Sequence, residues 1–249
     1  MVEKSNEQRP NLYDYLKIVA LIAMLIDHIG YYLLPECLWL RVVWRIAFPI
    51  FLFLVGFSWS YQWKNKICLT AVLLQIFMFF FYFQYGIGTD KLNILFGIMI
   101  ARLALWLIEK KNNVTLIILF VLLFIVLHYR LNQYVEYGSL SFFFALRGRI
   151  AKKYPKYFPL GILVLFAGMI KNILVFDFWF YSGNHVMLVG YTVFYALCYV
   201  LFSELSKENT VLKSSHPTVD SLILFCSKHA LPFYALHLAC LILIYFFMR

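Results

Sequence analysis

The chain has 249 residues, of which 63% are hydrophobic and 20% aromatic. This composition is too apolar for a water-soluble fold, so it excludes an ordinary soluble enzyme or binding module. The formal net charge of +10 does not indicate a nucleic-acid partner, because Lys and Arg lie in short clusters between apolar runs, as anchors beside a lipid bilayer do.

A polar tail precedes the first apolar run. Residues 1–14 are of mixed charge, and the run that follows ends in GYYLLPE without a small-residue cleavage site. We therefore expect a cytoplasmic tail and no cleaved signal peptide. The five cysteines show no CxxC spacing and mostly lie in apolar runs, which predicts small core residues. We predict no metal site.

The apolar runs predict an all-α, polytopic transmembrane helical bundle. A crossing needs about 20 mainly apolar residues, because a helix rises about 1.5 Å per residue through a hydrocarbon core of roughly 30 Å. Eight stretches meet this need, and the loops between them are short and contain Pro, Gly, Asn or charge. The expected spans are 15–34, 42–61, 66–85, 92–108, 114–130, 158–176, 186–204 and 228–247.

Span one carries three ionisable residues, Lys17, Asp27 and His28, where such side chains are costly and usually face the protein interior. Eleven residues at about 100° each return His28 to nearly the face of Lys17, roughly 16 Å further along the helix. Asp27 and His28 are neighbours, so their side chains diverge. One polar stripe therefore leads from the inner mouth toward the middle of the membrane.

Span two offers a partner for the carboxylate. Arg45 should lie within roughly 7 Å of Asp27 in depth, and Arg forms bidentate pairs with carboxylates, so we predict an Asp27–Arg45 pair. The alternative is a purely structural salt bridge that holds the two spans together. Pro49 should kink this span just below Arg45 and free a backbone carbonyl that lines a cavity.

His28 is the strongest candidate for chemistry. Its unperturbed pKa of about 6.5 suits a general base, although a membrane histidine can also serve only to bridge two helices. His237 in the last span should lie at a depth within roughly 7 Å of His28, so the two could flank one cavity. Tyr234, on the same face as His237, offers a phenolic donor. Site and structure are equally open for this second pair.

Asn93 opens the fourth span after GTDK, where a helix cap explains it as well as a ligand contact does. A ninth crossing at 135–147 would place the basic run RGRIAKKYPK on the cytoplasmic side, with the amino terminus also inside. We therefore expect nine spans; the alternative is eight spans with one interfacial or re-entrant helix. The chain is then one integral membrane domain, 1–249, with a basic cytoplasmic loop at 147–157 and a polar one at 205–227.

Four ordered motifs resemble the TraX family of conjugative plasmids: YLKIVALIAMLIDHIG at 15–30, WLRVVWRIAFPIFLFLVG at 39–56, NILF at 93–96 and FYALHLA at 233–239. The residues that match the family pattern are Lys17, Asp27, His28, Arg45, Pro49, Asn93 and His237. The chain departs from the pattern at Trp44, where the family has Gly, which leaves the acceptor in doubt more than the chemistry. The spacing of Lys17 and His28 is also similar to that in membrane acyltransferases of the acyltransferase-3 type.

The resemblance implies a multi-pass enzyme of the bacterial inner membrane that acetylates the amino terminus of mature pilin with acetyl-CoA. The donor's phosphates would then bind the basic loop, with Lys17 at the mouth, and His28 would act as base or form an acetyl-histidine intermediate. The basic residues expected to hold the donor are Arg147, Arg149, Lys152, Lys153 and Lys156. Alternatives are acyl transfer to a surface glycan or lipid, and a non-enzymatic part of a pilus or secretion apparatus. A transporter is less favoured because no repeat relates the two halves. The sequence leaves the oligomeric state open.

Overall fold

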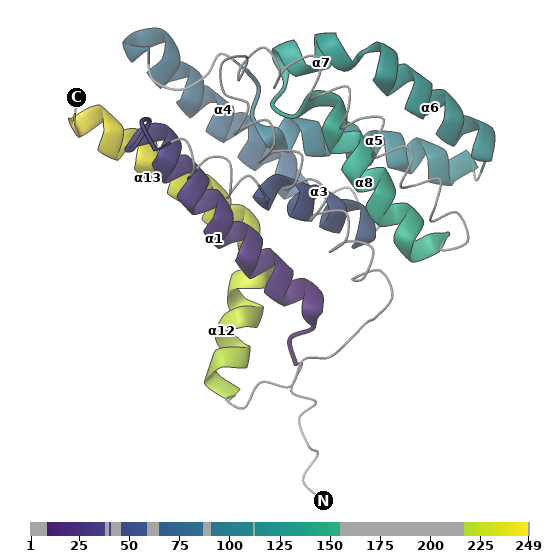
Figure 1. The fold of residues 1–249 in the computed structure, drawn as a ribbon, viewed down its shortest axis with the longest axis horizontal. Helices are drawn as coiled ribbons and strands as arrows, with labels where there is room; N and C mark the ends of the chain where they lie inside the picture. The colour runs from purple at the N-terminus through teal and green to yellow at the C-terminus, as the bar shows by residue number, and fades with distance from the viewer. Residues whose placement is uncertain are drawn as a thin grey trace, which may run out of the picture.

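The computed structural model of the chain describes residues 9–37, 40, 46–58, 65–86, 91–111, 113–154 and 217–248. Within these ranges the protein is all-α, as predicted, with one isolated β-bridge between Leu92 and Val135. Figure 1 shows a bundle from which one helix, α12, projects. The helices are α1 (Leu12–Tyr32), α3 (Ala47–Phe57), α4 (Asn65–Tyr85), α5 (Ile94–Lys111), α6 (Val114–Val126), α7 (His128–Tyr134), α8 (Gly138–Lys153), α12 (Pro217–Lys228) and α13 (Ala230–Met248).

Helix α1 begins at a capping box. The Asn11 side-chain oxygen accepts hydrogen bonds from the backbone N–H groups of Tyr13 (2.9 Å) and Asp14 (3.2 Å), and the Asp14 carboxylate accepts one from the Asn11 N–H at 3.1 Å. These contacts satisfy N–H groups that have no acceptor within the first helical turn. The cap fixes the start of the helix that carries Lys17 and His28.

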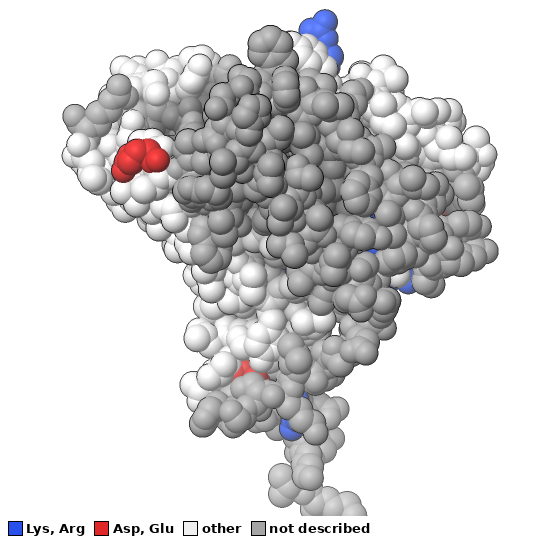
Figure 2. Space-filling view, in the orientation of Figure 1, with Lys and Arg blue, Asp and Glu red and all other residues white. Residues whose placement is uncertain are grey.

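Two of the described helices, α4 and α13, are long and apolar enough to cross a membrane. The expected span 114–130 is divided at Leu127 into α6 and α7, which bend by 65° and together make a third candidate span. The outer face of α4 carries large apolar side chains that are more than half exposed, as lipid contact requires: Leu69, Leu73, Ile76, Phe80 and Phe83. Figure 2 shows few charged side chains on the described part of one molecular face. The expected spans 158–176 and 186–204 lie outside the described residues, so the total of nine stays a prediction.

Helices α1 and α13 lie side by side and run in the same direction (Figure 1). Three contacts follow one another along both helices: Lys17 with Ser227 just before α13, His28 with His237, and Tyr32 with Tyr245. Consecutive crossings alternate in direction, so the first and last spans of a chain are parallel when the total number of crossings is odd. A parallel first and last helix is what an odd number of crossings would give, and the total of nine stays a prediction.

Helix α8 is the centre of the described bundle and packs against α3 and α5. All its residues from Gly138 to Gly148 are buried, together with Ile150 and Ala151. The crossing with α3 brings the two backbones together, because a side chain at Gly56 would overlap the carbonyl of Ala145 and one at Gly148 would overlap the carbonyl of Phe53. The ninth crossing was expected at 135–147, but this helix runs on to Lys153.

Two expected loops are helical where the structure describes them. The first part of the basic loop 147–157 continues α8, because its apolar residues pack into the bundle. The end of the polar loop 205–227 forms α12, which contacts α1. The cysteines also differ from expectation, since Cys37 and Cys240 are exposed and Cys68 and Cys226 are only partly buried. An exposed position on an apolar helix such as α13 can face lipid, which sequence alone cannot separate from a core position.

Candidate functional site

A cavity of about 710 Å³ lies between α1, α3, α5 and the segment where α12 meets α13. Four of the predicted site residues line it: Lys17, Asp27, His28 and Tyr234. Along α1 the lining extends from Lys17 to Tyr32, which is about 22 Å at about 1.5 Å per residue. The polar stripe predicted on α1 therefore faces one continuous cavity.

His28 and His237 are in direct contact across α1 and α13. Their Nδ1 and Nε2 atoms lie 2.8 Å apart, and the two rings are stacked with centroids 5.0 Å apart. His28 lines the cavity and His237 lies behind it, bonded to the backbone of its own helix. The structure thus brings together the two histidines that were expected to flank one cavity.

The hydrogen bonds determine which ring nitrogens carry protons. His237 Nδ1 lies 2.9 Å from the carbonyl oxygen of Phe233, which can only accept, so this nitrogen carries the hydrogen. In a neutral ring His237 Nε2 is then an acceptor, and His28 Nδ1 must donate to it. The basic lone pair of His28 is consequently on Nε2. A backbone carbonyl orients His237, and His237 orients His28.

Tyrosines surround this histidine pair. Tyr234 is buried, lines the cavity and meets the His237 ring edge-on with centroids 5.7 Å apart. Tyr32 is also buried, with its ring centroid 6.5 Å from that of His28. Tyr234 interacts electrostatically with Glu136 and Tyr137, from the turn between α7 and α8. The expected phenolic donor therefore lies beside the histidines.

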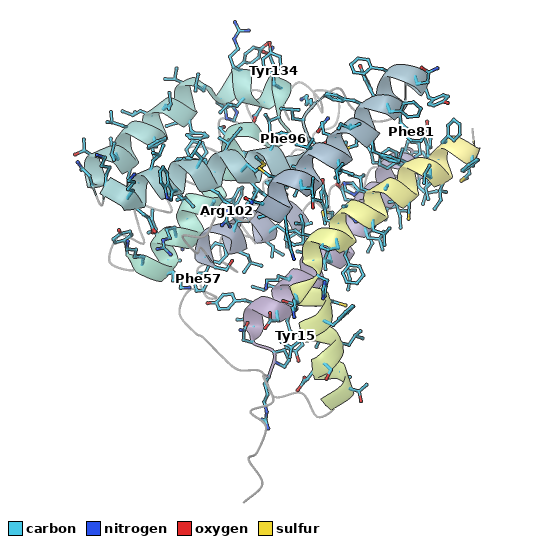
Figure 3. The ribbon with its side chains drawn as sticks, turned by 180° about the vertical axis from the view of Figure 1, so that it is seen from behind. Tyr15, Phe57, Phe81, Phe96, Arg102 and Tyr134 are labelled. Carbon is cyan, nitrogen blue, oxygen red and sulfur yellow. The ribbon has the colours of Figure 1, made fainter. Side chains whose placement is uncertain are left out.

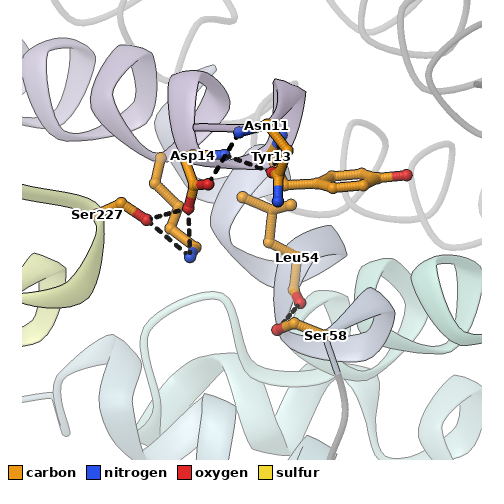
Figure 4. A network of polar contacts seen from close by, with 7 residues as sticks. Asn11, Tyr13, Asp14, Leu54, Ser58 and Ser227 are labelled. Carbon is orange, nitrogen blue, oxygen red and sulfur yellow. Dashed lines mark hydrogen bonds and ion pairs between the residues drawn. The ribbon is translucent and has the colours of Figure 1, made fainter. Parts of the chain in front are cut away.

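Lys17, which lines one end of the cavity, belongs to a polar network with Asp14 and Ser227, both labelled in Figure 4. Its Nζ donates a hydrogen bond to Ser227 Oγ at 2.9 Å and lies 3.5 Å from Asp14 Oδ1. Ser227 is buried and donates to the same Asp14 oxygen at 2.5 Å. Because Ser58, Lys66 and Lys228 are exposed lining residues at this end, the cavity reaches the protein surface there.

The partner predicted for Asp27 lies outside the described residues, as does Trp44, so the Asp27–Arg45 pair stays a prediction. Pro49 is buried in the first turn of α3, where its missing N–H would lack a helical acceptor in any case. A helix that begins at Ala47 accommodates this proline in its first turn. The predicted kink depends on residues 41–45, which also lie outside the description.

Asn93 is a structural residue in the described packing. It is fully buried, and its side-chain oxygen caps α5 by accepting a hydrogen bond from Leu95 N–H at 3.0 Å. Its side-chain nitrogen donates to the Ala71 carbonyl at 3.1 Å, and its own N–H donates to Gln75 at 2.7 Å. Both partners lie on α4, so Asn93 joins α4 to the start of α5. It is not among the cavity-lining residues.

The predicted donor-binding cluster does not line the cavity. Arg147 is only 1% exposed, within α8. Arg149 and Lys153 both pair with the buried Glu109 of α5, the latter at 3.6 Å, and a hydrogen bond with Tyr154 and the charge of Glu109 raise the pKa of Lys153. Lys152 Nζ lies 5.3 Å from the ring centroid of Phe57. Lys156 lies outside the described residues. Because α8 continues as a helix, these basic side chains point in different directions: Arg147 is buried in the core, whereas Arg149 and Lys153 pair with Glu109.

The cavity is also lined by charged residues that were not predicted from the sequence. Arg102, labelled in Figure 3, lies near the middle of α5 and is 8% exposed. The rule that selected His28, an ionisable residue inside an apolar span, would also have selected it. Lys66, Lys91, Glu136 and Lys228 follow spans or turns in the sequence, where no local signal separates them from solvated residues. No group of three or more His, Cys, Asp or Glu residues suited to a metal occurs in the described part of the chain.

Comparisons with known proteins give one family and one curated relative. The profile of the family described as TraX protein matches residues 13–245. The uncharacterized protein RP591 of Rickettsia prowazekii (strain Madrid E) is 32% identical over 150 residues, which cover 59% of this chain and 58% of that protein. The match thus spans less than two thirds of the relative's length. No solved structure matches the chain significantly.

Proposed function

Because the chain belongs to the TraX family, we propose that it is a membrane-embedded acetyltransferase that moves acetyl from acetyl-CoA to the amino-terminal amine of mature pilin. It would do so in the inner membrane of a bacterium that carries a conjugation system. The observation that carries the proposal is the hydrogen-bonded pair of His28 and His237, of which His28 lines a cavity that is continuous along α1 from Lys17. An oriented imidazole in such a cavity suits general base catalysis.

In the proposed reaction the acceptor's neutral amine attacks the carbonyl carbon of the thioester. The C–N bond forms and the C–S bond breaks, while the proton on the attacking nitrogen moves to His28 Nε2. His28 then returns this proton to the departing thiolate of CoA, so the imidazole is unchanged after one turnover. A route through acetyl-His28 uses the same nitrogen as nucleophile.

The neighbours of His28 have separate roles in this proposal. His237 is a positioning residue, since it holds His28 in the tautomer whose lone pair is on Nε2. Tyr234 is the candidate donor to the oxygen of the thioester carbonyl as negative charge develops there. Asp27, through its predicted pair with Arg45, would fix the position of α1 beside span two.

The test uses membranes that contain the full-length protein, radiolabelled acetyl-CoA and mature pilin. His28→Ala should lower transfer by about 10²- to 10⁴-fold, the usual contribution of a general base. Cys240→Ala is the matched control, because Cys240 is exposed on α13 three residues beyond His237. Undiminished transfer in His28→Ala at equal protein level would reject the catalytic role. A protein whose thermal midpoint does not respond to CoA would indicate a non-enzymatic component.

A further inference from the structure

Cationic side chains line the cavity at intervals between its surface opening and His28. Among the described lining residues are five Lys or Arg side chains and two carboxylates. Lys66 at the start of α4 and Lys228 at the end of α12 are exposed at the opening, and Lys17 lies beside them on α1. Arg102 lies deeper, within the bundle.

The position of Arg102 along the cavity follows from its neighbours on α5. Glu109 is seven residues further along, about 10 Å at about 1.5 Å per residue, and it pairs with Arg149 near the end of α8. Ile94, another lining residue, is eight residues earlier, about 12 Å in the other direction. Ile94 and Arg102 are the first and last lining residues of α5, so Arg102 is at the end of this wall that lies toward Glu109 and Arg149.

Resting on the proposed function, we infer that Arg102, with Lys17, Lys66 and Lys228, binds the phosphate groups of the acyl donor. A guanidinium keeps its charge when buried and presents paired N–H donors that fit phosphate oxygens, whereas Lys acts as a point charge suited to the wetter opening. A charge retained inside an apolar bundle indicates a function for that charge. The basic residues of α8 are not assigned to this role, because none of them lines the cavity.

The arrangement also suits the shape of a CoA thioester. Its phosphates and its acyl group are at opposite ends of a long, uncharged pantetheine arm, so the phosphate site must be away from the reacting histidine and toward the opening. Lys17 and His28 are separated by roughly 16 Å along α1 at about 1.5 Å per residue. Apolar lining residues between them, such as Met24, suit the uncharged arm.

The inference is tested by binding to the full-length protein in lipid nanodiscs, with CoA, adenosine 3′,5′-bisphosphate and pantetheine as separate probes. Arg102→Gln and Lys66→Gln should each weaken binding of CoA and of the bisphosphate about tenfold or more, as loss of a charge-assisted contact does. Pantetheine, which lacks the adenosine phosphates, should bind all variants alike. Arg102→Lys should restore part of the lost affinity. Lys110→Gln is the control, because Lys110 is exposed on the same helix and does not line the cavity.

Equal CoA affinity in wild type, Arg102→Gln and Lys66→Gln would overturn the inference, and so would a loss in Lys110→Gln as large as that in Arg102→Gln. Lys66→Gln changes an exposed side chain, so it reports on binding even if Arg102→Gln does not fold. Bisphosphate binding that depends on Arg102 in a protein without acetyl transfer would support the phosphate site and reject the proposed reaction. The two failures are thereby distinguishable.

Discussion

His28 on α1 and His237 on α13 are 209 positions apart in the chain and share a 2.8 Å hydrogen bond. Because the Phe233 carbonyl determines the tautomer of His237, the bond has one direction, from His28 to His237. The cavity-facing imidazole therefore depends on a second imidazole that is itself outside the lining.

The first prediction concerns this direction. His237→Phe removes the acceptor for His28 Nδ1–H and should lower kcat for acetyl transfer about tenfold to hundredfold, as loss of the partners that orient metal-bound imidazoles lowers activity. His237→Gln should retain more activity, because its amide oxygen can still accept the hydrogen bond. The measurement is kcat and KM at equal protein level. A uniform rise in KM with kcat unchanged would contradict a positioning role.

The second prediction concerns the crossing of α3 and α8. Gly56→Ala or Gly148→Ala places a methyl group against a backbone carbonyl that cannot move aside, so either should lower the free energy of unfolding by about 3 kcal/mol or more. Gly86→Ala is the control, because its added methyl meets open space and only the positive φ of 66° is unfavourable. Thermal unfolding in detergent measures the difference. Equal midpoints for Gly148→Ala and wild type would reject the close crossing.

The third prediction separates structure from ligand contact at Asn93. Asn93→Ala removes the α5 cap and the side-chain hydrogen bond to the Ala71 carbonyl, while the backbone N–H can still donate to Gln75, so the substitution should cost about 2–4 kcal/mol of stability. Because Asn93 does not line the cavity, the KM for the acyl donor should not change in the folded fraction. Stability and KM are measured on the same preparation. A stable variant with a raised KM would assign Asn93 to ligand binding instead.

The fourth prediction concerns the basic residues of α8. Arg149→Gln removes one of the two cations that pair with the buried Glu109, so it should destabilise the protein by about 3 kcal/mol, as loss of a buried ion-pair partner does. Its affinity for CoA should equal that of wild type at a temperature where both are folded. Lys152→Gln, which changes an exposed side chain, should affect neither quantity. Reduced CoA affinity in a fully folded Arg149→Gln would restore the role first predicted for this residue.

Depth along helices could be predicted from sequence, because every residue adds a fixed rise and each span starts near a membrane surface. That arithmetic predicted that His28 and His237 would be near each other. Their direct bond and its direction could not be predicted, because rotation about each helix depends on packing with the other helices. Asn93 could be placed at a helix start, whereas its bonds to α4 needed the fold.

The ion-pair partners of the basic residues could not be predicted from the sequence. The basic run from Arg147 to Lys156 is a cluster in one dimension, but a helix turns its members to different sides, and Glu109, about 40 residues away, takes two of them. Arg102 was accessible to the same reasoning as His28 and was missed. The end of α8 could not be predicted, because the few apolar residues after Arg147 are interspersed with charged ones and give no clear helical pattern.

The pairing of α1 with α13 has a consequence for biosynthesis. More than 200 residues separate the two histidines, so His28 enters the membrane long before its partner has been translated. Until α13 inserts beside α1, nothing from that helix fixes the tautomer of His28, and the wall that Tyr234 contributes to the cavity is missing. Nascent or truncated chains would therefore hold a disoriented imidazole, so assembly of the bundle would determine when the proposed acetyl transfer could begin.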